Sequence, residues 1–199
     1  GQSSRGLGDV YKRQAYMCTK DIDGNAVSLI QSNFHGIGST IGVGDLGFFL
    51  HNRGAGFNLI QNHPNSLKAG RKPLHTLSPT IWSVDGNLDM IIGTRGGRYQ
   101  PQLLSHFILK ILKNENLENA MNAPRWNIDE FGKETVSEIN IEPGLDEKII
   151  DVLINKGHKV NQLTKLQNSY GPISAIVKNN ENWIALHDIR VDTSSSIIE

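Results

Sequence analysis

The sequence is poor in the features that mark several common protein classes. It has one cysteine, Cys18, among its 199 residues, so neither an internal disulfide nor a zinc site built from several cysteines is available. No apolar run reaches the roughly eighteen residues that a membrane-spanning helix needs. Lys and Arg together number 20, as do Asp and Glu, and this zero net charge argues against nucleic-acid binding, which requires a basic surplus. The compartment stays open, because one unpaired cysteine is compatible with any of them.

The histidines give no metal motif. No His-Glu-x-x-His pattern occurs and no histidine is closely paired with carboxylates, although imidazole ligands must converge on a metal ion. We therefore predict no metal and no organic cofactor, and expect most histidines on the surface or in loops. The seven are His35, His51, His63, His75, His106, His158 and His187.

The chain does contain 20 glycines and a mixture of strand and helix patterns. Short runs bounded by turn residues predict hairpins, and apolar residues at helical spacing predict amphipathic helices. Together they predict one α+β sandwich domain. The expected strands are residues 15–20, 26–31, 48–50, 80–84, 88–93, 173–178 and 183–186. The expected helices are residues 103–112, 117–123 and 145–156, and residues 32–47 and 53–72 are expected to be loops.

Residues 1–14 differ from all that follows. They show no apolar periodicity, and residues 9–14 (DVYKRQ) resemble the in-frame translation of a sequencing adapter. Our hypothesis is that residues 1–14 are a non-native leader and that the natural domain occupies residues 15–199; the alternative is a genuine leader. Segments of this kind are excluded from fold reasoning.

Three short segments have the residue types of a binding or catalytic site. Gly96 and Gly97 follow an apolar strand, where two backbone N–H groups without a nearby Cβ suit an oxyanion hole, although such pairs are more often turns. Residues 36–38 (GIG) lack the strand-to-helix context of a phosphate loop. His75 and Thr76 place a hydroxyl beside an imidazole, which suits a substrate carboxylate or, more simply, a turn.

A series of ordered motifs resembles a known family. Residues 21–28 (DIDGNAVS), 47–52 (GFFLHN), 71–80 (RKPLHTLSPT), 93–97 (GTRGG) and 123–126 (APRW) occur in the order and spacing of the γ-glutamyltranspeptidase (glutathione hydrolase) small subunit. His63-Pro64-Asn65 fits the same order, and Asp188-Ile189-Arg190 resembles the family's Asp-Pro-Arg.

The resemblance implies an N-terminal-nucleophile hydrolase fold, with two central sheets between helical layers, of which this chain is the small-subunit half. In that family an N-terminal threonine attacks the γ-glutamyl amide, with its own α-amine as the base. Anchored on residues 21–25, that threonine falls at position 14, which is Gln14 here. Residues 8–11 (GDVY) offer a looser match that also lacks threonine, and Thr19 lies inside a predicted strand. The resemblance therefore implies that the nucleophile is missing from this chain.

The same resemblance assigns several other site residues. Ser32 takes the place of the hydroxyl that orients the nucleophile, and Gly96 and Gly97 match the oxyanion-hole pair. His75 and Thr76 take the place of the paired serines that bind the glutamyl α-carboxylate. Asn33 and Asn52 are further donor-binding candidates.

The segment that binds the donor's ammonium departs from the family pattern. Gly56 stands where the family has an aspartate, and Arg53 adds a positive charge where a cation would bind. This is typical of the divergent, acylase-like branch of the family, whose donors are glutaryl-type groups without the amine.

We therefore predict a γ-glutamyltransferase-family amidohydrolase subunit that cleaves γ-glutamyl or similar acyl amides and acts with a large subunit from the same precursor. Two alternatives remain: a non-catalytic relative that binds γ-glutamyl-type peptides, and a structural partner of the large subunit. The donor and the ratio of hydrolysis to transpeptidation stay open.

Overall fold

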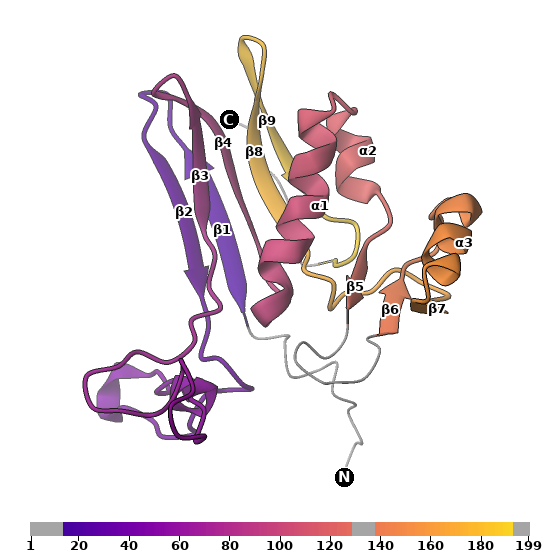
Figure 1. The fold of residues 1–199 in the computed structure, drawn as a ribbon. Helices are drawn as coiled ribbons and strands as arrows, with labels where there is room; N and C mark the ends of the chain where they lie inside the picture. Colours follow the sequence, from indigo (N-terminus) through magenta and orange to yellow (C-terminus); the bar gives the residue numbers. More distant parts are fainter. Residues whose placement is uncertain (1–13, 129–137, 193–199) are drawn as a thin grey trace.

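The computed structural model describes residues 14–128 and 138–192. Residues 1–13, most of the suspected leader, lie outside this part of the chain. The described elements form layers, with a β-hairpin on one face of a larger sheet and two helices on the other (Figure 1). No helix in the described ranges is long and apolar enough to cross a membrane.

The first hairpin consists of β1 (Ala15–Lys20) and β2 (Ala26–Gln31), as predicted. Its strands pair antiparallel from Ala15 opposite Gln31 to Lys20 opposite Ala26. The Asp21 carboxylate closes the turn by accepting a hydrogen bond from the Asn25 backbone N–H at 2.8 Å.

The central sheet has four antiparallel strands in the order β3-β4-β8-β9. Both of its hairpins were predicted from turn residues between apolar runs. The strands are β3 (Thr80–Val84), β4 (Asn87–Thr94), β8 (Ile173–Asn179) and β9 (Asn182–His187).

Helices α1 (Gln100–Leu112) and α2 (Leu117–Asn122) cover one face of this sheet (Figure 1). Because side chains alternate along a strand, Met90 and Ile92 of β4 point toward the helices and form a core with Leu104 and Phe107. The Asn116 side chain caps α2 by accepting hydrogen bonds from two backbone N–H groups.

The opposite face of the sheet is covered by the β1–β2 hairpin, which contacts β4 and β8. Gly93 makes this close approach feasible, since a Cβ at that position would overlap the ring of Tyr16. The hairpin's outer face is left open: Met17 and Leu29 lie directly opposite each other and are 51% and 47% exposed.

A smaller unit contains three strands that the sequence did not predict. They are β5 (Trp126–Ile128), β6 (Glu138–Ile141) and β7 (Lys159–Gln162), in the order β5-β6-β7. Helix α3 (Glu147–Asn155) connects the parallel pair β6 and β7 and packs Ile150 against Ile139 and Ile141. The predicted helix 145–156 is confirmed with slightly shorter bounds.

Residues 32–79 form a long, largely irregular segment at one end of the sheets (Figure 1). The only regular structure described there is two short 3-10 helices, Gly44–Leu46 and Arg53–Gly56, and two isolated bridges. The strand predicted at 48–50 is wrong. These three residues are exposed, and only Phe49 takes part in a bridge, to Gly42, so the apolar run has no neighbouring strand to pair with.

Candidate functional site

Gly96 and Gly97 lie where β4 ends and α1 approaches. Gly96 has a φ of 134° and Gly97 a φ of 57°, conformations that L side chains rarely adopt. The 3-10 turn Gly97–Tyr99 leads directly into α1, so the two glycines stand at the N-terminal end of a helix. Backbone N–H groups at such an end favour negative charge. The oxyanion hole that the sequence predicted here stays a prediction.

The Gln14 side chain reaches this glycine pair. Its carboxamide oxygen accepts a hydrogen bond from the Gly96 N–H at 3.3 Å, and the residue is only 8% exposed. Its amide nitrogen is buried with no hydrogen-bond partner in the described part of the chain. An amide oxygen therefore already lies on one of the two N–H groups that the oxyanion role requires.

A cavity of about 200 Å³ opens beside Gln14 and Gly97. Three of the predicted site residues line it: Gly56, Thr76 and Gly97. No Asp or Glu is among its lining residues, which are Gln14, Phe34, His35, Ala55, Gly56, Leu74, Thr76, Gly97 and Arg98.

Arg53 links the two loops that frame this cavity. Its Nη1 donates to the Thr76 hydroxyl at 3.3 Å and its Nη2 donates to the Ser32 carbonyl at 3.2 Å. Its guanidinium carbon lies 5.4 Å from the centre of the Phe34 ring. The side chain is 5% exposed, and burial lowers its pKa. Three residues that the sequence singled out, Ser32, Arg53 and Thr76, are therefore brought together.

The other predicted site residues have different surroundings. Asn52 holds the 35–38 turn, since its amide donates to the His35 and Gly38 carbonyls at 3.1 and 3.0 Å. Asn33 donates to the Ile37 carbonyl at 3.3 Å. His75 is exposed and does not line the cavity. The Ser32 hydroxyl accepts a hydrogen bond from the Phe34 N–H at 3.0 Å, which leaves its own proton available to donate.

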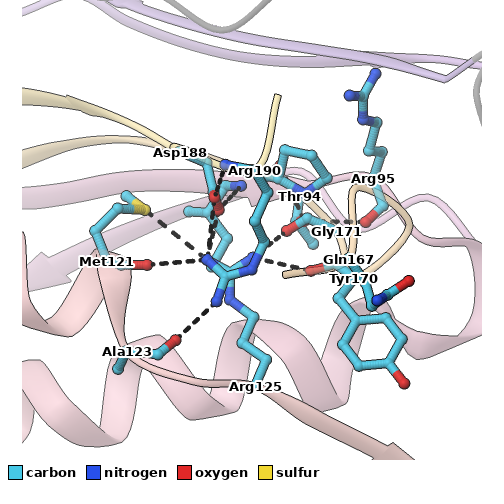
Figure 2. A network of polar contacts seen from close by, with 12 residues as sticks. Thr94, Arg95, Met121, Ala123, Arg125, Gln167, Tyr170, Gly171, Asp188 and Arg190 are labelled. Carbon is cyan, nitrogen blue, oxygen red and sulfur yellow. Dashed lines mark hydrogen bonds and ion pairs between the residues drawn. The ribbon is translucent and has the colours of Figure 1, made fainter. Parts of the chain in front are cut away.

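Behind the glycine pair, two arginines and two carboxylates form a buried network. Figure 2 shows three of its members, Arg125, Asp188 and Arg190. Asp188 accepts from Arg125 at 2.5 Å and from Arg190 at 3.1 Å. Arg190 also donates to both carboxylate oxygens of Glu142, with Nε at 2.9 Å from Oε1. None of the four residues is more than 7% exposed.

The charges of this network balance. Burial alone would raise the pKa of the Asp188 carboxyl, but Arg125 and Arg190 outweigh it and hold that pKa below its ordinary value. Burial would likewise lower the pKa of Arg190, yet its bonds to Glu142 and the Asp188 charge raise it. These two shifts favour the ionised forms of Asp188 and Arg190, whereas burial lowers the pKa of Arg125.

The network reaches the glycine pair through Gly171. Nη1 of Arg125 donates to the carbonyls of Tyr170 and Gly171 at 2.9 and 2.7 Å (Figure 2). Gly171 has a φ of 54°, and a Cβ there would overlap the Arg95 carbonyl. Its Cα lies 3.6 Å from where a Cβ of Gly96 would be. Sequence reasoning found the Arg125 and Asp188 motifs but not this connection, for which a lone glycine gives no signal.

Two further features of the site were not predicted from the sequence. Gln100, the first residue of α1, is fully buried, and its side-chain oxygen accepts from the Ser78 N–H at 3.2 Å, which ties the 71–80 segment to the helix start. Arg98 lines the cavity, whereas Arg53 does not. Among the described residues no group of three or more metal-ligating side chains comes together.

The comparisons with known proteins agree with one another on the family of this chain. The sequence model of the gamma-glutamyltranspeptidase family matches residues 10–198. The chain is 33% identical over 171 residues to the glutathione hydrolase-like YwrD proenzyme of Bacillus subtilis (strain 168), covering 85% of this chain and 33% of the relative. It is 31% identical over 175 residues to the oxamate amidohydrolase proenzyme of Klebsiella pneumoniae, covering 87% and 32%. The chain thus spans about a third of the length of these curated relatives.

Solved structures show the same fold. Cephalosporin acylase from Bacillus halodurans matches with a TM-score of 0.78 and 29% identity, over 92% of this chain and 34% of that one. Gamma-glutamyltranspeptidase from Pseudomonas nitroreducens, complexed with L-DON, matches with a TM-score of 0.75 and 23% identity. That match covers 92% of this chain and 99% of the other, so one whole chain of that protein corresponds to the length described here.

Proposed function

Because the chain belongs to the γ-glutamyltranspeptidase family, we propose that it is the small, nucleophile-bearing subunit of a two-chain amidohydrolase that cleaves γ-glutamyl or similar acyl amides. We further propose that the reactive threonine belongs at position 14, which Gln14 occupies in this chain. With Gln14 in place, the chain retains the binding site without its nucleophile.

The observation that carries this proposal is the contact between Gln14 and Gly96. The side chain at position 14 lies at the cavity, and its amide oxygen accepts from the Gly96 N–H at 3.3 Å. A threonine side chain is shorter, so it would leave this N–H free for the carbonyl oxygen of a substrate while keeping a hydroxyl beside the cavity. Nucleophile and oxyanion donors would then flank one carbonyl group, as acyl transfer requires.

The chemistry follows from these groups. The threonine oxygen bonds to the amide carbon while its proton passes to the α-amine, and the Gly96 and Gly97 N–H groups stabilise the resulting oxyanion. The C–N bond then breaks, and the amine leaves with the proton. Water attacks the ester in hydrolysis, or a second amine in transpeptidation, which releases the acyl group and restores the hydroxyl. The Ser32 hydroxyl, whose proton is available, orients the threonine oxygen.

A large subunit is the expected partner, and the open face of the β1–β2 hairpin is where we place it. Met17, Val27 and Leu29 are 51%, 52% and 47% exposed there, although a strand face of this composition is normally covered. The relatives are about three times as long as this chain, so the remainder of a protein of that length would supply enough residues for another layer.

The test is to restore the nucleophile. The chain is expressed with its upstream large chain so that it starts at position 14, once with Gln14→Thr and once with Gln14→Val, which matches threonine in shape but lacks the hydroxyl. Both are assayed with chromogenic γ-glutamyl and glutaryl anilides. We expect the threonine variant to exceed the valine variant by about 10³-fold or more in kcat.

Equal rates for the two variants would contradict the proposal. The alternative of a non-catalytic relative is favoured by Gln14 itself. It predicts that the Gln14 chain, assembled with the large chain, binds acyl peptides without turnover, whereas no binding at all would favour a structural subunit.

A further inference from the structure

Phe34 has a backbone conformation that a bulky side chain rarely adopts. Its φ is 77°, in the left-handed region, where the Cβ approaches the following carbonyl oxygen. Of the other five non-glycine residues with positive φ in the described ranges, four are Asn or Asp, which tolerate this region, whereas an aromatic residue there is an outlier. Two nearby positions with positive φ, Gly36 and Gly38, are glycines. The sequence therefore keeps a phenylalanine where glycine would be the unstrained choice.

Hydrogen bonds on both sides of Phe34 impose this conformation. On one side the Phe34 N–H donates to the Ser32 hydroxyl oxygen at 3.0 Å, and the Ser32 carbonyl accepts from Arg53 at 3.2 Å. On the other side the Asn52 side chain accepts from the His35 N–H at 2.9 Å and donates to the His35 carbonyl at 3.1 Å. Strained residues persist where the surrounding contacts over-determine them in this way, and such residues cluster at ligand sites.

Burial in an apolar core does not compensate the strain. Phe34 is only half-buried and belongs to neither of the two apolar cores in the described part of the chain. Its ring lines the cavity instead. Arg53, which does not line the cavity, lies with its guanidinium carbon 5.4 Å from the ring centre, and the His35 ring packs edge-to-face at 4.1 Å between ring centres. A cation and an imidazole therefore brace a ring that faces the cavity.

The cavity lies between two groups of residues. Gln14, Gly97 and Arg98 form the side next to the glycine pair. The other six lining residues all come from the irregular 32–79 segment, and Phe34 is the largest of them. Since the cavity holds only about 200 Å³, the position of this one ring decides how wide a group fits beside the glycine pair.

We propose that Phe34 is a specificity-determining residue whose strained backbone holds its ring as a fixed wall, so that the cavity accepts slender, unbranched acyl chains and excludes wide ones such as aromatic acyl groups. This rests on the proposed amidohydrolase function, and it concerns the width of the acyl group rather than its charge. The scissile amide lies at Gly96 and Gly97 in this arrangement, and the acyl chain extends past the Phe34 ring.

The first experiment varies acyl width at constant charge in the two-chain assembly with threonine at position 14. The anilides of butyric and phenylacetic acid are both neutral and differ mainly in width. We expect the assembly with Phe34 to favour the butyryl anilide, and Phe34→Ala to shift the ratio of the two kcat/KM values toward the phenylacetyl anilide by at least about tenfold. Phe34→Tyr keeps the ring and should keep the ratio. Leu59→Ala, at a position that is 86% exposed on the same segment and outside the cavity lining, should have no effect.

The second experiment tests the strain without turnover. Phe34→Ala keeps a Cβ at a φ of 77°, whereas Phe34→Gly removes both the ring and the strain. Both variants lose the same ring contacts, and the strain of a Cβ in this region exceeds the extra chain entropy of glycine. We therefore expect the glycine variant to unfold at a higher urea midpoint than the alanine variant. An equal or lower midpoint would show that the backbone is not strained, and would overturn the fixed wall.

A third measurement separates the wall from the activity. Binding of phenylacetamide and butyramide to the same assemblies is measured by calorimetry. A gain in phenylacetamide binding in Phe34→Ala, without hydrolysis of any anilide, would remove the proposed activity and leave the wall standing. Hydrolysis with an unchanged ratio in Phe34→Ala and Phe34→Gly would overturn the wall and leave the activity, and an absence of both binding and hydrolysis in every variant would overturn both. Dissociation of both assemblies would assign Phe34 to the subunit interface and would also overturn the wall.

Discussion

Arg53 and Arg125 are both almost fully buried, at 5% and 3% exposure, but they have opposite surroundings. Arg125 donates to the Asp188 carboxylate at 2.5 Å and to two carbonyls behind the glycine pair, inside a network in which two cations meet two carboxylates. Arg53 donates only to a hydroxyl and a carbonyl, beside a cavity. One site has its full set of partners within the chain, and the other does not.

The difference lies in whether the buried charge is compensated within the described chain. Burying a charge is tolerated when an opposite charge and further hydrogen bonds accompany it, as they do at Arg125. At Arg53 the described residues supply two neutral acceptors and no opposite charge.

The largest effect is expected from breaking the compensated site. Asp188→Asn removes the carboxylate that Arg125 and Arg190 share, and leaves two buried cations with one remaining carboxylate. We expect the free energy of unfolding to fall by about 3–5 kcal/mol, measured by urea unfolding of the assembled protein. Glu115→Gln is the matched control, because it breaks the exposed Lys110–Glu115 pair and should change stability by at most about 1 kcal/mol. A loss equal to the control's would mean that the network is not structural.

A smaller effect is expected where the network meets the glycine pair. Gly171→Ala places a Cβ against the Arg95 carbonyl and Leu103, at a φ of 54°. We expect a loss of about 1–3 kcal/mol. If the network positions Gly96, this substitution in the form with threonine at position 14 should also lower kcat by a larger factor than it raises KM. Gly157→Ala is a useful comparison, since that glycine has a φ of 85° but no atom within 4 Å of its Cβ position, so it tests strain without the overlap. Equal kcat losses in both variants would separate Gly171 from the site.

Acid should weaken the network side of the molecule in two steps. Both ring nitrogens of His106 on α1 are buried without a hydrogen-bond partner in the described structure, and burial, aided by the Arg125 charge, lowers its pKa to about 4. The unfolded chain binds this proton at its ordinary pKa of about 6.5, so stability should fall as the pH drops from about 6.5 to about 4.

Below that range the lowered pKa of Asp188 adds a further loss, since its stabilising charge disappears as the pH falls through the folded-state value.

The measurable part of the profile is that of His106. With allowance for the partial exposure of its ring, we expect the free energy of unfolding to fall by an amount on the order of 1 kcal/mol between pH 7 and pH 5. His106→Phe keeps the ring beside Trp126, which lies 4.7 Å away, and should flatten that part of the profile. An unchanged slope in the variant would assign the effect to other groups.

The sequence predicted the features that have local signals and missed those that depend on contacts between distant segments. The family, the N-terminal-nucleophile hydrolase fold, the hairpins and α1 are confirmed, because turn residues, apolar periodicity and ordered motifs are local signals. The strands β5, β6 and β7 were missed because they are only three or four residues long and contain asparagines, so their apolar pattern is too short to recognise. His106 is an exception to the expectation that histidines lie on the surface or in loops.

At the site, the sequence singled out residues of loops that meet at the cavity, but it did not predict the contacts between them. Arg53 was recognised as a charge in an unusual place, yet its burial and its contacts with Ser32 and Thr76 depend on loops more than twenty residues apart. The roles of all the predicted site residues stay predictions, including those of Ser32, Gly96, Gly97 and Thr76 as well as those of Asn33, Asn52 and His75. The assignment of residues 1–14 as a leader also stays a prediction, and the family match begins at residue 10, within that segment.

The smallest expected effect on stability distinguishes the two arginines most directly. Since Arg53 has no anionic partner in the described chain, Arg53→Gln removes a buried charge and leaves a shorter, neutral side chain that still carries an amide donor. We expect the free energy of unfolding to stay within about 1 kcal/mol or to rise, because the desolvation penalty of the cation is lost with it. The same substitution at the other site, Arg125→Gln, leaves Asp188 short of a partner and should cost about 3–5 kcal/mol. A loss at Arg53→Gln as large as that at Arg125→Gln would show that both arginines are compensated, and the contrast between the two sites would disappear.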